Sequence, residues 1–275
     1  MNADWTVHDD GSFDLTTPGV NLRRGYPAME HEPLRPLRVE VRRGSDACEI
    51  EYRLTEGSVS VRLWRHGESP VLSCTLRGFE TAPHWVYPLH GAMVEGADRF
   101  FRHGLGFSGT SGFVPLAGQK DAWSLESYLI SAVVAPDHAS VAIGALDHAD
   151  FLQKTHLHSR IYRSGFCNRD IDAVVPLLEA GFSTERIALG GEELRLPDLH
   201  FLAATTTWDA CQALARDIAD SAGARPHQPP RYHWCSWYQK GCNLTFDDLK
   251  AFLDGADATG QQGALQTVQI DDGYC

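Results

Sequence analysis

The chain lacks both a long apolar run and a recognisable export signal. Of its 275 residues 43% are hydrophobic, yet no stretch approaches the roughly 20 consecutive apolar residues needed to span a bilayer. The start, Met1 to Asp10, is acidic and has neither the basic nor the apolar region of a secretory signal. The sequence therefore predicts a cytoplasmic protein with no membrane partner.

Positive charge and clustered cysteines are also scarce. The 24 Lys and Arg residues stand against 36 Asp and Glu residues, which gives a net charge of -12. Such a balance argues against nucleic acid and anionic membranes as partners and favours a neutral ligand such as a sugar. The 7 cysteines are an odd, scattered set, which predicts reduced thiols and no disulfide framework.

The dominant pattern is that of β-strands. Between Leu37 and Leu63 apolar and polar residues alternate in three runs, and the turn residues Gly44 to Asp46 and Glu56-Gly57 separate these runs. This period of two predicts an antiparallel meander with one wetted face. Similar runs continue to about residue 200, so we predict a mainly β fold with a large antiparallel β-sandwich over residues 1–204.

Two glycines near the end of this region predict a hairpin. Gly190-Gly191 separates the runs Thr184–Leu189 and Glu192–Leu196, and two adjacent glycines suit a turn with positive φ angles. We therefore expect the two runs to pair with each other.

Helical spacing begins after Thr206. Trp208, Cys211 and Leu214 recur at helical intervals, and Thr206 with Asp209 forms an N-terminal capping signal. The following residues 221–230 are rich in Gly and Pro, which is typical of a domain boundary. Residues 205–230 are thus predicted to be a helix and a linker.

Residues 231–275 have the pattern of a βαβ unit. An aromatic strand over Tyr232–Tyr238, a helix that opens at Thr245 and an apolar strand over Leu265–Asp271 follow one another closely. Such a unit has parallel strands and a right-handed crossover. We interpret it as the start of a (β/α)8 barrel, which is incomplete here because a whole barrel takes about 250 residues.

The ends of these two strands carry the candidate site. By alternation Asp271 faces the barrel mouth, Asp272 follows where Gly273 breaks the strand, and Trp237 shares the inner face of the first strand with Cys235. Carboxylates accept hydrogen bonds from vicinal hydroxyls, and an indole stacks on a pyranose ring. Taken alone, motifs this short also occur as strand-end turns and core aromatics.

The combination resembles family 36 of the glycoside hydrolases, the α-galactosidase group. The resemblance lies in Trp234-Cys235-Ser236-Trp237-Tyr238 followed by Gln269-Ile270-Asp271-Asp272-Gly273-Tyr274. Upstream, the stretches Gly190 to Pro197 and Trp208 to Leu214 look like that family's passage from the sandwich to the barrel. The resemblance is specific over about residues 184–275, whereas before residue 184 it concerns only the overall architecture.

The resemblance implies retaining hydrolysis of terminal α-galactosyl groups on small α-galactoside oligosaccharides. It assigns Asp271 and Asp272 to the hydroxyls at C4 and C6 of galactose and Trp237 to the same pocket. It also implies that the nucleophile and the acid/base lie further along the barrel, so that this chain holds no catalytic residue and is inactive by itself. Spacing alone leaves a catalytic role open, since adjacent aspartates can lie about 5–5.5 Å apart.

Other functions fit the same residues. A related α-N-acetylgalactosaminidase, or a galactosyltransferase of the raffinose-synthase kind, would differ at positions not identifiable in this sequence. A non-catalytic β-sandwich that binds carbohydrate or joins copies into a homo-oligomer is the alternative outside the enzymes.

No cofactor and no metal are expected. His156 and His158 share one strand face among 13 histidines, but no third ligand is recognisable. A hydrogen-bonded or solvated histidine pair is the favoured interpretation, and family 36 chemistry implies no metal.

Overall fold

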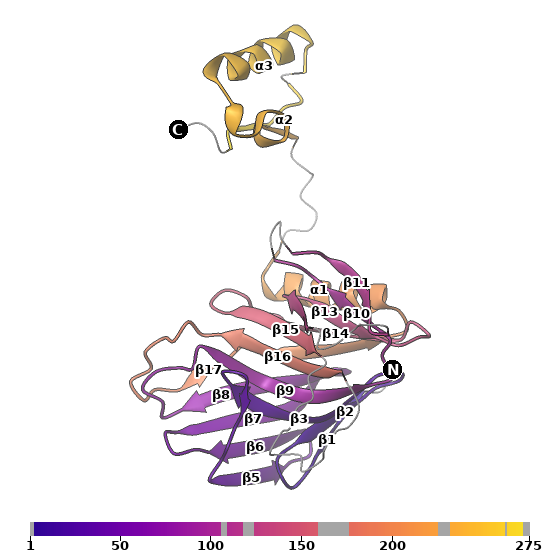
Figure 1. Cartoon of the computed structure of the whole chain (residues 1–275), viewed down its shortest axis with the longest axis vertical. Coiled ribbons are helices and arrows are strands. Elements are labelled where there is room, and N and C mark those ends of the chain that lie inside the picture. The colour runs from indigo at the N-terminus through magenta and orange to yellow at the C-terminus, as the bar shows by residue number, and fades with distance from the viewer. Residues whose placement is uncertain are drawn as a thin grey trace. The chain divides into compact units, whose positions relative to one another are not determined.

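The computed structural model describes residues 3–105, 109–117, 124–158, 176–224, 232–261 and 263–271. They fall into two compact units, Met1–Ala224 and Arg225–Cys275, which Figure 1 shows.

The first unit contains two antiparallel sheets. The 8-stranded sheet A has the order β1 (Asp4–Val7), β2 (Phe13–Thr16), β3 (Asn21–Met29), β9 (Trp85–Glu95), β16 (Leu177–Ser183), β15 (Leu152–His158) and β12 (Ser124–Tyr128), with β4 (Glu32–Pro33) paired to β3. The 10-stranded sheet B has the order β11 (Gly112–Pro115), β10 (Arg99–Arg102), β13 (Ser131–Val134), β14 (Ser140–Ala145), β18 (Leu199–Ala204), β8 (Ser69–Arg77), β7 (Ser58–His66), β6 (Ala47–Arg53) and β5 (Arg38–Arg43), with β17 (Leu194–Arg195) paired to β8. The predicted mainly β fold is confirmed.

The core lies between the inner faces of the two sheets. Alternate residues of each strand point inward, as the period of two requires. The largest side chains that are fully buried there are aromatic: Phe13, Tyr52, Phe100, Phe182 and Phe201. The predicted meander is part of this arrangement, because Ile50 of β6 lies opposite Val41 of β5 and Val61 of β7.

The helix predicted after Thr206 is α1 (Thr207–Ser221), and the hydroxyl of Thr206 accepts the backbone N–H of Asp209 as expected. Its apolar face, which includes Ala210 and Leu214, packs against Ala142 and Leu202 on the outer face of sheet B. The helix therefore belongs to the first unit, whose last residue lies inside the predicted linker 205–230.

The predicted hairpin around Gly190-Gly191 is wrong. The turn exists, with φ angles of 58° and 84° at the two glycines, but the chain beyond it pairs with β8, where Leu194 lies opposite Leu76. The chain before the turn forms a bridge from Ala188 to Thr81. Both arms bond to other segments, a choice that the local turn sequence does not determine.

The second unit contains β19 (His233–Cys235), α2 (Trp237–Lys240), a 3-10 turn (Gly241–Asn243), α3 (Phe246–Ala258) and β20 (Thr267–Gln269). The two strands are parallel, as predicted. The strand expected over Tyr232–Tyr238 ends early, because Ser236 has helical dihedral angles (φ -61°, ψ -33°) and turns the chain into α2. A βαβ unit is present, and its continuation into a barrel remains a prediction.

Among the described segments, neither α1 nor any other helix has the length and apolar character required to cross a membrane.

Burial differs between the units, and this difference predicts their local stability. Among the described residues of the second unit only Cys235 and Ser236 are buried, whereas β14 and β16 are buried along their whole length. Amides of β19, α3 and β20 should therefore exchange with solvent about 100-fold faster or more than those of β14 and β16, because local opening exposes little apolar surface. Hydrogen-exchange mass spectrometry measures this, and equal protection of both units would contradict it.

Candidate functional site

The ends of β19 and β20 lie side by side in the second unit. His233 and Cys235 are in register with Thr267 and Gln269. Beyond the paired residues, the Ser236 hydroxyl accepts the backbone N–H of Asp271 at 2.9 Å, and the Ser236 N–H donates to the Gln269 carbonyl at 3.1 Å. Asp271 and the residue before Trp237 are thus joined directly at the carboxyl ends of adjacent parallel strands.

The side chain of Asp271 lies on the predicted face. Its Oδ2 accepts from Cys235 Sγ at 3.4 Å and from Gln269 Nε2 at 3.2 Å, so these three residues share one side of the sheet. On the other side Trp234 stacks on Phe252 of α3, with ring centroids 4.1 Å apart. The alternation inferred from the sequence is correct for these strands.

Trp237 reaches this region by a different route from the predicted one. It is the first residue of α2 and does not belong to β19, so the prediction that it shares a strand face with Cys235 is wrong. Trp237 is 41% exposed, which leaves part of its surface available to a ligand. Asp272 lies outside the described residues.

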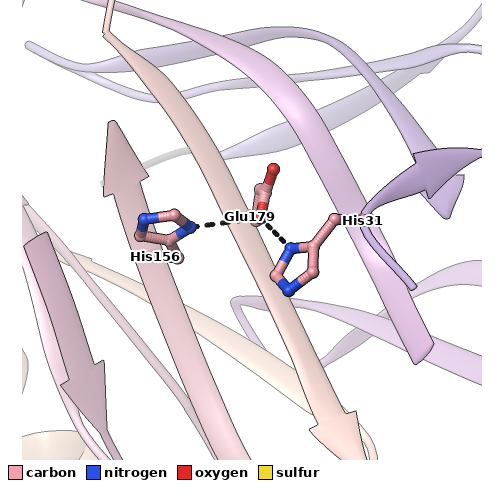
Figure 2. A group of neighbouring side chains, drawn as sticks. All are labelled: His31, His156 and Glu179. Atoms are coloured by element: carbon pink, nitrogen blue, oxygen red, sulfur yellow. Dashed lines mark hydrogen bonds and ion pairs between the residues drawn. The ribbon is translucent and has the colours of Figure 1, made fainter. Parts of the chain in front are cut away.

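A second cluster of titratable residues lies on sheet A. Glu179 of β16 is 1% exposed, and four imidazoles contact its carboxylate. The Nδ1 atoms of His31 and His156 lie 3.2 and 3.3 Å from Oε2, while the Nε2 atoms of His158 and His90 lie 2.9 and 3.0 Å from Oε1. Figure 2 shows His31 and His156 converging on Glu179 from opposite sides.

Strand pairing brings these residues together. Glu179 lies directly opposite His156 in the β15–β16 ladder, and His158 is two residues further along the same face of β15. His90 comes from β9 on the other side of β16. Leu178 and Ala180, the neighbours of Glu179, belong to the core, so the cluster occupies the outer face of sheet A.

The fourth imidazole, His31, comes from a turn between β3 and β4. Glu30 and His31 both have positive φ angles, 49° and 65°, in the two-residue connection between the paired residues Met29 and Glu32. Such a turn normally takes Asn or Gly, and other residues at positive φ are strained. The Glu30 carboxylate accepts the backbone N–H of His84 at 2.7 Å, which helps to hold this turn.

The electrostatics of the cluster keep the carboxylate ionised. Burial by itself opposes ionisation of Glu179, but the hydrogen bonds from His156, His158, His31 and His90 outweigh it and hold the pKa of Glu179 well below its usual range. Burial also lowers the pKa of His158, against the opposing effect of the Glu179 carboxylate. A buried anion surrounded by ring nitrogens results.

The sequence alone points to only part of this cluster. The pair His156 and His158 is recognisable on one strand face, but a third ligand is not, because the other members are distant in the sequence. One local signal was available: Glu179 interrupts the apolar run Leu177 to Phe182, and a charged residue inside a strand buried on both faces requires partners.

Comparison with known proteins shows a shared fold. No protein-family model and no curated protein matches the chain. Among solved structures, the α-N-acetylgalactosaminidase NagBb from Bifidobacterium bifidum aligns with a TM-score of 0.58 and 11% identity, over 98% of this chain and 50% of that chain. The GH36 α-galactosidase AgaB from Geobacillus stearothermophilus aligns with a TM-score of 0.48 and 10% identity, over 99% of this chain and 39% of that chain. AgaA from the same organism gives 0.47 and 12%, over the same shares of the two chains.

The chain has a glycoside-hydrolase-related fold. The predicted resemblance is confirmed at the level of the fold, because the α-N-acetylgalactosaminidase NagBb aligns over 98% of this chain with a TM-score of 0.58. The chain spans half or less of the length of these enzymes. At 10–12% identity the likeness concerns the fold, and a fold does not by itself define a function.

Replacing the central carboxylate tests how much the histidine cluster contributes to stability. Glu179→Gln should lower the free energy of unfolding by about 3 kcal/mol, because hydrogen bonds to a charged group contribute roughly 1.5–3 kcal/mol each and the amide group cannot accept all four. Glu126→Gln on β12, which lies beyond β15 in the same sheet, is the control: Glu126 pairs with Lys154 at 3.2 Å but its side chain is 46% exposed, so the change should cost about 1 kcal/mol or less. Urea unfolding followed by fluorescence measures both changes, and equal losses would show that the histidine cluster stabilises the fold no more than an exposed ion pair does.

Proposed function

We propose that the chain is the N-terminal part of a retaining glycoside hydrolase that acts on terminal α-galactosyl groups. The observation that carries the proposal is the placement of Trp237 and Asp271 behind the ends of two adjacent parallel strands. Strand ends of this kind are where barrel enzymes build their sites. The fold shared with NagBb supports the enzyme class.

Each residue has a binding role in this proposal. The carboxylates of Asp271 and Asp272 accept hydrogen bonds from two hydroxyls of the sugar, and the indole of Trp237 lies against its apolar face. The bonds from Cys235 and Gln269 to one oxygen of Asp271 orient the carboxylate before the sugar arrives. The nucleophile and the acid/base belong to later strands of the barrel, so the chain alone does not hydrolyse a glycoside.

A second substrate has one specific observation in its favour. NagBb, which is an α-N-acetylgalactosaminidase and has been solved in complex with GalNAc, aligns with TM-scores of 0.58 and 0.56. Both sugars present the same hydroxyls at C4 and C6, so the roles of Asp271 and Asp272 are the same in either case. The ratio of the hydrolysis rates of an aryl α-galactoside and an aryl α-N-acetylgalactosaminide decides between the two substrates.

The first test compares the chain with the product of its whole gene. We expect no turnover of an aryl α-galactoside or aryl α-N-acetylgalactosaminide by the purified 275-residue chain, and turnover of one of them by the protein translated from any continuation of the reading frame. Hydrolysis by the chain alone would refute the assignment of catalysis to later strands. A stop codon directly after Cys275 would favour the non-catalytic sandwich module.

The second test concerns Asp271 in the active, full-length protein. Asp271→Ala should raise KM about 10- to 100-fold while kcat changes less, because the lost hydrogen bonds to a charged group are present in substrate and transition state alike. Asp254→Ala, at an exposed position of α3, is the matched control and should leave both constants unchanged. A collapse of kcat with unchanged KM would instead identify Asp271 as a catalytic carboxylate.

A further inference from the structure

We propose that His31, His156 and Glu179 bind a divalent transition-metal ion, with zinc as the representative, on the outer face of sheet A. The inference is independent of the strand-end site described above, because all three residues belong to the sandwich. Their ligand atoms, the two Nδ1 atoms and a carboxylate oxygen, lie within 4.8 Å of one another. Figure 2 shows the two rings directed at the same carboxylate.

The distances suit an ion between the three groups. Zinc binds imidazole nitrogen and carboxylate oxygen at about 2.0–2.2 Å, which in a tetrahedral site places neighbouring ligand atoms about 3.4 Å apart. His31 Nδ1 and His156 Nδ1 lie 3.2 and 3.3 Å from Glu179 Oε2, close to that separation. The side chain of His31 is 42% exposed and lies on a turn. A small movement of its ring would therefore bring its Nδ1 to the same separation from the Nδ1 of His156.

The donor set selects the class of ion. Two imidazoles and one carboxylate suit zinc, cobalt, nickel or copper, whereas calcium and magnesium prefer oxygen ligands. Three protein ligands leave one position of a tetrahedral ion open for water or another group. The ion also brings positive charge to a buried carboxylate whose described partners are imidazoles, which lowers the cost of burying it.

The surrounding groups fix the three ligands in place. The second oxygen of Glu179 accepts from His158 and His90, which are both 2% exposed, so the carboxylate is held from behind. The Tyr87 hydroxyl lies 3.0 Å from His31 Nε2. If His31 donates its Nε2–H to this oxygen, the Nδ1 lone pair is directed at the metal position, as in most histidine ligands.

The turn that presents His31 is a separate observation in favour of a site. A Glu-His pair at two positive φ angles costs about 1–2 kcal/mol per residue relative to Gly. The Glu30 N–H donates to the Trp85 carbonyl at 3.0 Å, and the bond between Glu30 and His84 adds a second anchor. Backbone strain of this kind persists where the surrounding structure holds the residue in place, and it is concentrated at functional sites.

The experiment is a metal titration of the full chain after dialysis against a chelator. Isothermal titration with Zn²⁺ and the visible absorption of Co²⁺ report affinity and coordination, and circular dichroism checks that each variant is folded. We expect saturable binding, an intense Co²⁺ spectrum typical of four-coordination, and a zinc-dependent rise of the melting temperature. His31→Ala and His156→Ala should each weaken binding at least 10-fold.

Two further variants keep the test decisive. His66→Ala removes an exposed histidine of β7 on the other sheet and should leave the affinity unchanged. His158→Ala, which removes a residue that positions Glu179, should weaken binding about 10- to 100-fold without abolishing it. Absence of zinc binding, or zinc binding by the double variant His31→Ala/His156→Ala, would overturn the proposal. The cluster would then be a hydrogen-bonded network without a metal.

Discussion

Strand β16 is buried on both faces, and this constraint determines what the outer face of sheet A can carry there. Every residue of β16 is buried, including Glu179 at its centre. An isolated carboxylate at such a position would be protonated or would destabilise the fold. Four imidazoles that converge on its two oxygens resolve this conflict, and in doing so they connect β9, β15, β16 and the turn before β4.

The sandwich was predictable because its signal is local. Alternation over Leu37 to Leu63 determines which side of each strand is apolar, and short turns leave neighbouring strands little choice but to pair. The capping pair Thr206 and Asp209 likewise defines the start of α1 within a few residues. The partner of Leu194 was not predictable in the same way, since its choice of β8 depends on the position of a strand more than 100 residues earlier.

In the strand-end site, too, some features follow from the local sequence and others depend on contacts between distant segments. Parallel pairing placed Cys235, Gln269 and Asp271 on one face, as the period of two requires. The aromatic composition of Tyr232–Tyr238 favoured a strand throughout, yet Ser236 ends it because its hydroxyl accepts the N–H of Asp271 and its N–H donates to Gln269. This contact between chain segments, which no local pattern records, sets the position of Trp237.

The shared fold does not by itself define the chemistry of the two sites. The likeness to NagBb at 11% identity concerns the fold alone, since many sequences can satisfy the apolar burial between two sheets. The outer face of a sheet is less constrained by packing, so polar residues can accumulate there without disturbing the core. Glu179 is an exception, because it is ionised and buried and has partners from three other chain segments, namely β9, β15 and the turn before β4. A group that requires so many partners, beside a turn with two positive φ angles that supplies one of them, is the basis of the proposed metal site.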